Sequence, residues 1–266
     1  MAPLAAGVFG RIAGAAMGER ISAAGSGLWR VWRMSCRAGL AALLALMAVV
    51  TAAPAQDRRQ NAPGAFDFYV LALSWSPTYC EEAAQQRPPS AAARQQCGAR
   101  PYAFVVHGLW PQYEHGFPEY CSRDDRRPDR TTIGNMLDLM PSTGLIFHQW
   151  RRHGVCSGLS VRAYFEHVRR ARARVKVPEE YLALATHKTV SPAEVEEAFV
   201  RANHGLTHDA VAVNCSGRRL SEVRICMTRD LAFRPCPEVD RRACRARQVV
   251  MPPVRLGTAV EPRTPL

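Results

Sequence analysis

Two short stretches of this 266-residue chain carry side chains suited to proton transfer and anion binding. The first, FVVHGLWPQ, covers residues 104–112, and the second, FHQWRRHGVC, covers residues 147–156. Imidazole groups titrate close to neutral pH, so they can accept a proton in one step and donate one in another. The two stretches are therefore candidate halves of an acid–base site, whose polar members are His107, His148, Gln149, Arg152 and His153.

The polar residues of the second stretch share one face of a predicted helix over residues 142–153. Successive helical residues turn by about 100°, which places this whole polar set within an arc of about 140° and Trp150 outside it. Such a face can bind an anion and move protons. The alternatives are a solvated basic surface and a metal site, but histidines five residues apart do not stack as metal ligands on a helix.

His107 follows a predicted buried strand over residues 101–106 and precedes Gly108. A glycine at this point indicates the end of the strand, where a ligand can approach the backbone closely. The alternative is a histidine that simply caps a core strand.

The remaining pattern predicts an α+β fold in a single domain. Residues 161–175 have the apolar spacing of an amphipathic helix, and Ser191 with Glu194 forms a capping box. Residues 81–96 lack apolar periodicity and are predicted to be an exposed loop, and the proline-rich tail after Cys244 is predicted to be loosely packed. The other predicted elements are strands at 66–75, 209–215 and 220–228, a helix at 131–140 and an irregular connection at 112–129.

Residues 1–55 are predicted to be an N-terminal extension and a cleaved signal peptide. Two arginines precede an apolar run at 38–50 that ends in a small-residue processing site, and Met34 is an alternative start. Removal of this segment lowers the formal charge from +12 to (35−5)−(23−1) = +8. The mature domain, 56–266, stays basic, which favours a polyanionic partner. No second apolar run is long enough to span a membrane, so we expect no membrane attachment after cleavage.

Eight cysteines remain after that cleavage, an even number that predicts four disulfides in an exported protein. Eight cysteines allow 105 pairings, so the pattern leaves the connectivity open. The eight are Cys80, Cys97, Cys121, Cys156, Cys215, Cys226, Cys236 and Cys244.

The two histidine stretches, together with the FDFYVLALSW opening at 66–75, resemble the ribonuclease T(2) family of secreted acid ribonucleases over most of residues 66–244. The resemblance implies a single α+β domain with a central, mainly antiparallel sheet flanked by helices and stapled by disulfides. The pairing it implies is Cys80 with Cys97, Cys121 with Cys156, Cys215 with Cys244, and Cys226 with Cys236.

This resemblance further implies metal-free cleavage of single-stranded RNA through a 2′,3′-cyclic phosphate, with no cofactor. His153 is then the base for the ribose 2′-hydroxyl and His107 the acid for the leaving 5′-oxygen. His148 holds the phosphate, and Arg152, where the family usually has lysine, stabilises the charge of the transition state.

Substrate contacts follow from the same resemblance. Trp110 is expected to stack on a base, and Gln112 lies in the region that selects the base in relatives. DNA is not expected to be cut, because it lacks the 2′-hydroxyl nucleophile. We expect a monomer in the periplasm or the extracellular medium.

Gln149 departs from the family pattern, which has glutamate there. A neutral amide leaves the pocket more cationic and lowers the pKa of neighbouring imidazoles relative to a glutamate. We therefore expect retained activity with an altered pH profile. The alternatives are an RNA-binding protein of the same fold without catalysis, and a disulfide-stapled metallohydrolase that a chelator would inactivate.

Overall fold

A computed structural model describes residues 61–98, 100–122 and 127–254. The predicted signal segment at 1–55 and the predicted start of the mature domain at Gln56 lie outside these residues.

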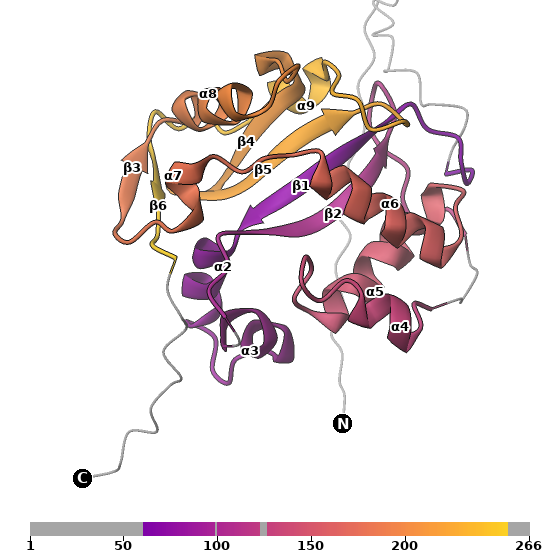
Figure 1. The fold of residues 1–266 in the computed structure, drawn as a ribbon, viewed down its shortest axis with the longest axis horizontal. Helices are drawn as coiled ribbons and strands as arrows, with labels where there is room; N and C mark the ends of the chain where they lie inside the picture. Colours follow the sequence, from indigo (N-terminus) through magenta and orange to yellow (C-terminus); the bar gives the residue numbers. More distant parts are fainter. Residues whose placement is uncertain (1–60, 99, 123–126, 255–266) are drawn as a thin grey trace, which may run out of the picture. The chain divides into compact units, whose positions relative to one another are not determined.

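The described residues form one six-stranded sheet flanked by helices (Figure 1). β1 lies between β2 and β5, β4 pairs with the other side of β5, and β3 pairs with β6. Every pair is antiparallel except β5 with β6, so the expectation of a mainly antiparallel α+β fold is confirmed. The strands are β1 (Phe68–Trp75), β2 (Phe104–Gln112), β3 (Lys188–Val190), β4 (Val211–Ser216), β5 (Arg219–Met227) and β6 (Val249–Met251).

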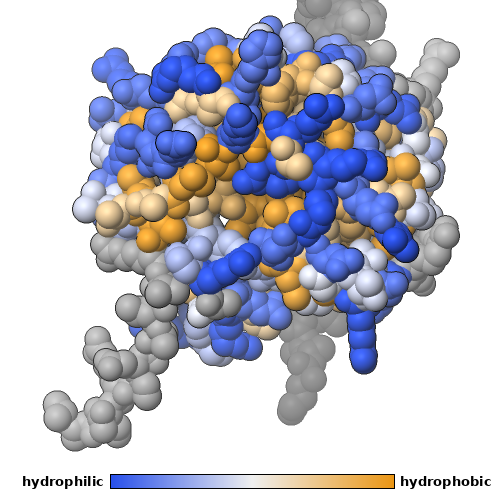
Figure 2. Space-filling model, in the orientation of Figure 1, coloured by the Kyte–Doolittle hydropathy of each residue, from blue (hydrophilic) through white to orange (hydrophobic). Residues whose placement is uncertain are grey.

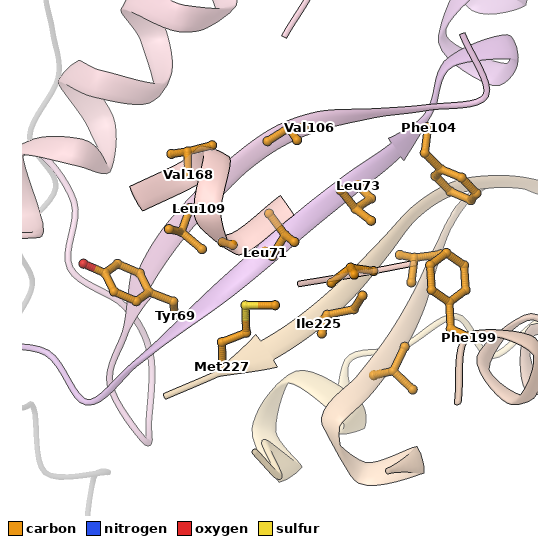
Figure 3. Close-up of a cluster of buried hydrophobic side chains, with 14 of the residues drawn as sticks. Tyr69, Leu71, Leu73, Phe104, Val106, Leu109, Val168, Phe199, Ile225 and Met227 are labelled. Atoms are coloured by element: carbon orange, nitrogen blue, oxygen red, sulfur yellow. The ribbon is translucent and has the colours of Figure 1, made fainter. Parts of the chain in front are cut away.

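The sheet is buried on both faces, which explains why β1 is apolar almost throughout. On one face, Leu71 and Leu73 pack in the main core with Val168 and Phe199 of the helices (Figure 3). On the other face, Phe68 and its neighbours form a second, smaller cluster with the cysteines Cys226 and Cys236. A strand buried on both faces loses the alternation of apolar and polar residues that a half-buried strand shows.

The helices begin where the sequence offers side-chain caps. Ser142 Oγ accepts a hydrogen bond from Leu145 N, and Ser191 and Glu194 form the predicted capping box. The helices and 3₁₀ turns are α2 (Ser76–Ala83), α3 (Ala91–Gly98), α4 (Arg130–Gly134), α5 (Thr143–Arg152), η1 (Gly154–Cys156), α6 (Val161–Ala173), α7 (Glu179–Leu182), α8 (Pro192–Ala202), η2 (His208–Ala210) and α9 (Pro237–Arg241).

The predicted exposed loop at 81–96 is wrong, because this segment carries the end of α2 and most of α3. Gln96 is buried and donates a hydrogen bond to Ser76 Oγ (2.9 Å), and a disulfide joins the two helices. Tertiary contacts and the covalent link thus stabilise helices whose sequence has little apolar periodicity.

Two predicted boundaries and the predicted tail also differ from the structure. The helix predicted at 131–140 ends at Gly134 and continues as turns. The tail after Cys244 contains β6, which pairs with β3 and buries Val249 and Met251. The sequence did not predict these two short strands, because three residues are too few to show a period.

β2 does not end at His107, contrary to the prediction, but continues to Gln112. Ala72 of β1 pairs with Gly108 and Leu73 with Val106, so His107 is the extra residue of a β-bulge. Bulges are found next to active sites because the additional residue re-aims a side chain. The glycine therefore marks an irregularity within the strand and not its end.

The four disulfides in the structure are those implied by the resemblance, and they join Cys80 to Cys97, Cys121 to Cys156, Cys215 to Cys244, and Cys226 to Cys236.

Hydrophilic residues cover much of the face shown in Figure 2, with apolar residues reaching the surface between them. No helix within the described ranges is long and apolar enough to cross a membrane.

Gly154→Ala tests how tightly the end of α5 packs. A Cβ at this position would lie 2.4 Å from Trp150 Cε3 and 3.0 Å from the Tyr164 ring. We expect the substitution to lower the free energy of unfolding by about 1–3 kcal/mol, measured by urea denaturation. The control is Gly144→Ala in α5, where a Cβ has room and a helix-favouring residue should cost nothing. Equal stability of the two variants would contradict this packing argument.

Candidate active site

A cleft of about 260 Å³ opens beside β2, α5 and α9. Its lining includes every candidate polar residue of the two histidine stretches. These residues are His107, Trp110, Gln112, His148, Gln149, Arg152 and His153.

The close packing of α5 on β2 depends on Gly108. A Cβ there would lie 2.1 Å from Gln149 Oε1 and 2.3 Å from Trp110 Nε1. Without it, the Trp110 indole donates a 2.7 Å hydrogen bond to Gln149 Oε1. From the core side, the Tyr164 hydroxyl of α6 donates to the Leu109 carbonyl (2.8 Å). These two hydrogen bonds fix β2 between α5 and α6.

The indole of Trp110 lies against both candidate acid–base histidines. Its ring centroid is 5.2 Å from that of His107 and 5.4 Å from that of His153. The indole is partly exposed in the cleft, where it also contacts the Arg224 guanidinium at 5.3 Å. One side chain thus contacts both imidazoles.

The helical-wheel prediction for α5 agrees with the structure. His148, Gln149 and Arg152 line the cleft with His153, which caps the helix C-terminus, whereas Trp150 is buried against Tyr164 in the core. Arg152 also forms a 2.9 Å ion pair with Glu119, from the connection between β2 and α4. The cationic groups of this face are thus partly neutralised from outside the helix.

His153 is the most strongly perturbed histidine of the cleft. Only 7% of it is exposed, and its Nδ1 atom is buried without a hydrogen-bond partner. Burial, reinforced by the positive charges of Arg152 and the neighbouring histidines, lowers its pKa to about 3. His153 is therefore a neutral imidazole, able to accept a proton, across the whole mildly acidic and neutral range.

His148 has a lowered pKa as well, and Gln149 adds no negative charge beside it. Burial and the charge of Arg152 lower the pKa of His148 below its ordinary value. Gln149 is 1% exposed and contributes no charge to offset these cations. Gln112, by contrast, only donates a 2.9 Å hydrogen bond to the preceding carbonyl of Pro111.

The sequence analysis missed Glu222 and Arg224 of β5. Glu222 accepts hydrogen bonds from His107 Nδ1 and Arg224 Nε, each at 2.7 Å, one on each carboxylate oxygen. Burial opposes ionisation of Glu222, but the bonds and charges of these two partners outweigh it and hold its pKa below the usual value. The signal in the sequence is the alternation of polar and apolar residues along β5, which indicates a strand but not a site.

Within the described ranges, no three His, Cys, Asp or Glu side chains are grouped to hold a metal ion. The cleft instead offers a neutral buried imidazole, a second imidazole paired with a carboxylate, and arginines at its edge. This set can accept one proton, donate another and bind an anion between them.

A family model described as the Ribonuclease T2 family matches residues 66–236. A ribonuclease from Aeromonas hydrophila is 46% identical over 97 residues, which make up 36% of this chain and 40% of that protein. A probable ribonuclease from Haemophilus influenzae is 34% identical over 134 residues, 47% of this chain and 48% of that protein. The chain thus spans less than half the length of these two relatives.

The fold is also found among solved structures. An RNase-related protein from Calystegia sepium superposes with a TM-score of 0.56, at 23% identity, over 71% of this chain and 98% of that protein. At this level of identity the likeness concerns the fold alone.

Gln149→Glu is expected to raise the pKa of His153 and of His148, because an added negative charge favours the imidazolium form. The measurement is an NMR titration of the histidine side chains. Gln86→Glu makes the same charge change on an exposed residue that does not line the cleft, and should leave both pKa values unchanged. Identical titration curves for His153 in the wild type and Gln149→Glu would show that this amide does not govern the electrostatics of the cleft.

Proposed function

This chain belongs to the ribonuclease T2 family, and on that premise we propose that it is an endoribonuclease that cleaves single-stranded RNA without a metal ion. The observation that carries the proposal is the pairing of His107 and His153 across the indole of Trp110. Two imidazoles in one cleft, one neutral and one paired with a carboxylate, are suited to opposite directions of proton transfer.

His153 acts as the general base. Its lowered pKa keeps it neutral, so it takes the proton from the ribose 2′-hydroxyl while the 2′-oxygen attacks the adjacent phosphorus. His107 gives a proton to the departing 5′-oxygen as the bond from phosphorus to that oxygen breaks. The products are a 2′,3′-cyclic phosphate and a free 5′-hydroxyl, and the reverse proton transfers reset both imidazoles.

The remaining polar groups bind the phosphate and the base. His148 and Arg152 line the cleft beside His153 and stabilise the added negative charge of the transition state. The oxygen of Gln149 is used by Trp110, which leaves its NH₂ group to donate to a phosphate oxygen. Trp110 offers an indole face for stacking, with Gln112 nearby as a contact for the base.

DNA is not cut in this scheme, because it has no 2′-hydroxyl. The four disulfides fit a protein that folds in an oxidising compartment. We propose that the chain acts as a monomer in the periplasm or outside the cell, after cleavage of residues 1–55.

Purified, oxidised protein is expected to cleave a defined RNA in EDTA and to leave 2′,3′-cyclic phosphate ends. His107→Ala and His153→Ala should each lower kcat by at least about 100-fold, because each removes one proton-transfer group. His204→Ala, at an exposed residue outside the cleft, should keep full activity. The readout is gel analysis of end-labelled RNA together with identification of the termini.

Intact RNA that is nevertheless retained on a filter would show an RNA-binding protein without catalysis. Activity that disappears in EDTA would instead indicate a metallohydrolase.

The pH dependence of cleavage tests the role of His153. A base with a pKa of about 3 stays neutral as the pH falls, so kcat/KM should not decrease when the pH is lowered into the mildly acidic range. Gln149→Glu should move the acidic limb of kcat/KM to higher pH by about one unit, because it raises that pKa. Gln86→Glu again serves as the control for added charge. An acidic limb that does not move would rule out His153 as the titrating base.

A further inference from the structure

We propose that Glu222 is a positioning residue for this reaction, fixing the ring orientation and the tautomer of His107 from a strand that does not carry either histidine. The inference rests on the proposed function, in which His107 is the general acid. Glu222 reaches His107 across the whole width of β1, and the surrounding structure is arranged to permit that contact.

The path across the sheet is open because β1 carries small side chains at this level. Ser74 and Ala72 are the β1 partners of Glu222 and Arg224, and the bulge that contains His107 lies opposite Ala72 and Leu73 on the other edge of β1. Glu222 is 6% exposed, so its carboxylate lies within the protein and not in solvent.

The hydrogen bond assigns the tautomer. An ionised carboxylate only accepts hydrogen bonds, so the 2.7 Å contact requires that Nδ1 of His107 carry a hydrogen. The lowered pKa of Glu222 keeps it ionised at neutral pH. Nε2 is then the nitrogen that takes up and releases a proton, which is the atom that a general acid needs to have free. Without this bond either tautomer could form.

The second oxygen of Glu222 makes the carboxylate rigid. It accepts from Arg224 Nε at 2.7 Å, and the Arg224 guanidinium lies 5.3 Å from the centre of the Trp110 ring. Each carboxylate oxygen therefore has one donor, and neither can rotate without losing a bond. Glu222 in this way fixes His107 and Arg224, which both line the leaving-group side of the cleft.

His107 lies among charged side chains from several elements. Glu222 of β5 contacts His107 directly. The charged or titratable residues that line the cleft with His107 are Arg224 of β5, His148, Arg152 and the C-cap His153 at α5, and Glu238 and Arg242 at α9. Among the described residues, Glu222 is the carboxylate that His107 contacts, at 2.7 Å from Nδ1.

Glu222→Gln tests the proposal because it removes the charge and nearly preserves the shape. We expect kcat for RNA cleavage to fall by about tenfold or more with little change in KM, since a positioning partner acts on the chemical step. The alkaline limb of the pH–rate profile should move to lower pH by about one unit. A purely structural role would lower activity without moving that limb.

Glu196→Gln is the matched control. Glu196 is a half-buried carboxylate next to the sheet, where it accepts a hydrogen bond from Val213 N of β4, but it does not line the cleft. Its variant loses the same charge and should keep the wild-type kcat and pH profile. If both variants shift the alkaline limb equally, or Glu222→Gln leaves it in place, the proposal is overturned.

¹⁵N NMR of the wild-type protein provides a test that does not depend on activity or on the folding of a variant. We expect neutral His107 to carry its hydrogen on Nδ1. A hydrogen on Nε2 would overturn the inference even if RNA is cleaved. If RNA is not cleaved and the hydrogen is on Nδ1, the proposed function fails while the contact stands.

Discussion

The structure of the cleft depends on how closely α5 approaches β2. Gly108 lies so near the helix that a single Cβ would overlap Gln149 Oε1. This approach lets the indole of Trp110 bond to the helix and contact both imidazoles. The position of each histidine relative to the other is thus set by backbone packing of the core and not by contacts between the two side chains. Rigid elements of this kind hold a site more accurately than loops do.

Much of the fold and of the site could be predicted because local rules dominate there. The face of α5 follows from the helical period, and Ser142 and Ser191 cap their helices as their sequence context indicates. The helices within 81–98 could not be predicted, because a disulfide and the burial of Gln96 stabilise them. The β-bulge at His107 could not be predicted either, since it depends on the register between two strands.

Glu222 illustrates why single-sequence analysis misses partners. It lies 115 residues from His107 in the chain, and the contact appears only once β1 has been placed between β2 and β5. Alternation identifies its strand but not the neighbour across the sheet. The carboxylates around the cleft come from elements other than α5: Glu119 pairs with Arg152, Glu222 with Arg224, and Glu238 with Arg242.

The two disulfides nearest the cleft give its walls a covalent frame. Cys156 follows His153 by three residues and is tied to Cys121, beside the segment that carries Glu119. Cys226 follows Arg224 by two residues and is tied to Cys236, at the start of α9. In a reducing environment both ties would be missing, and noncovalent packing alone would hold these two walls of the cleft.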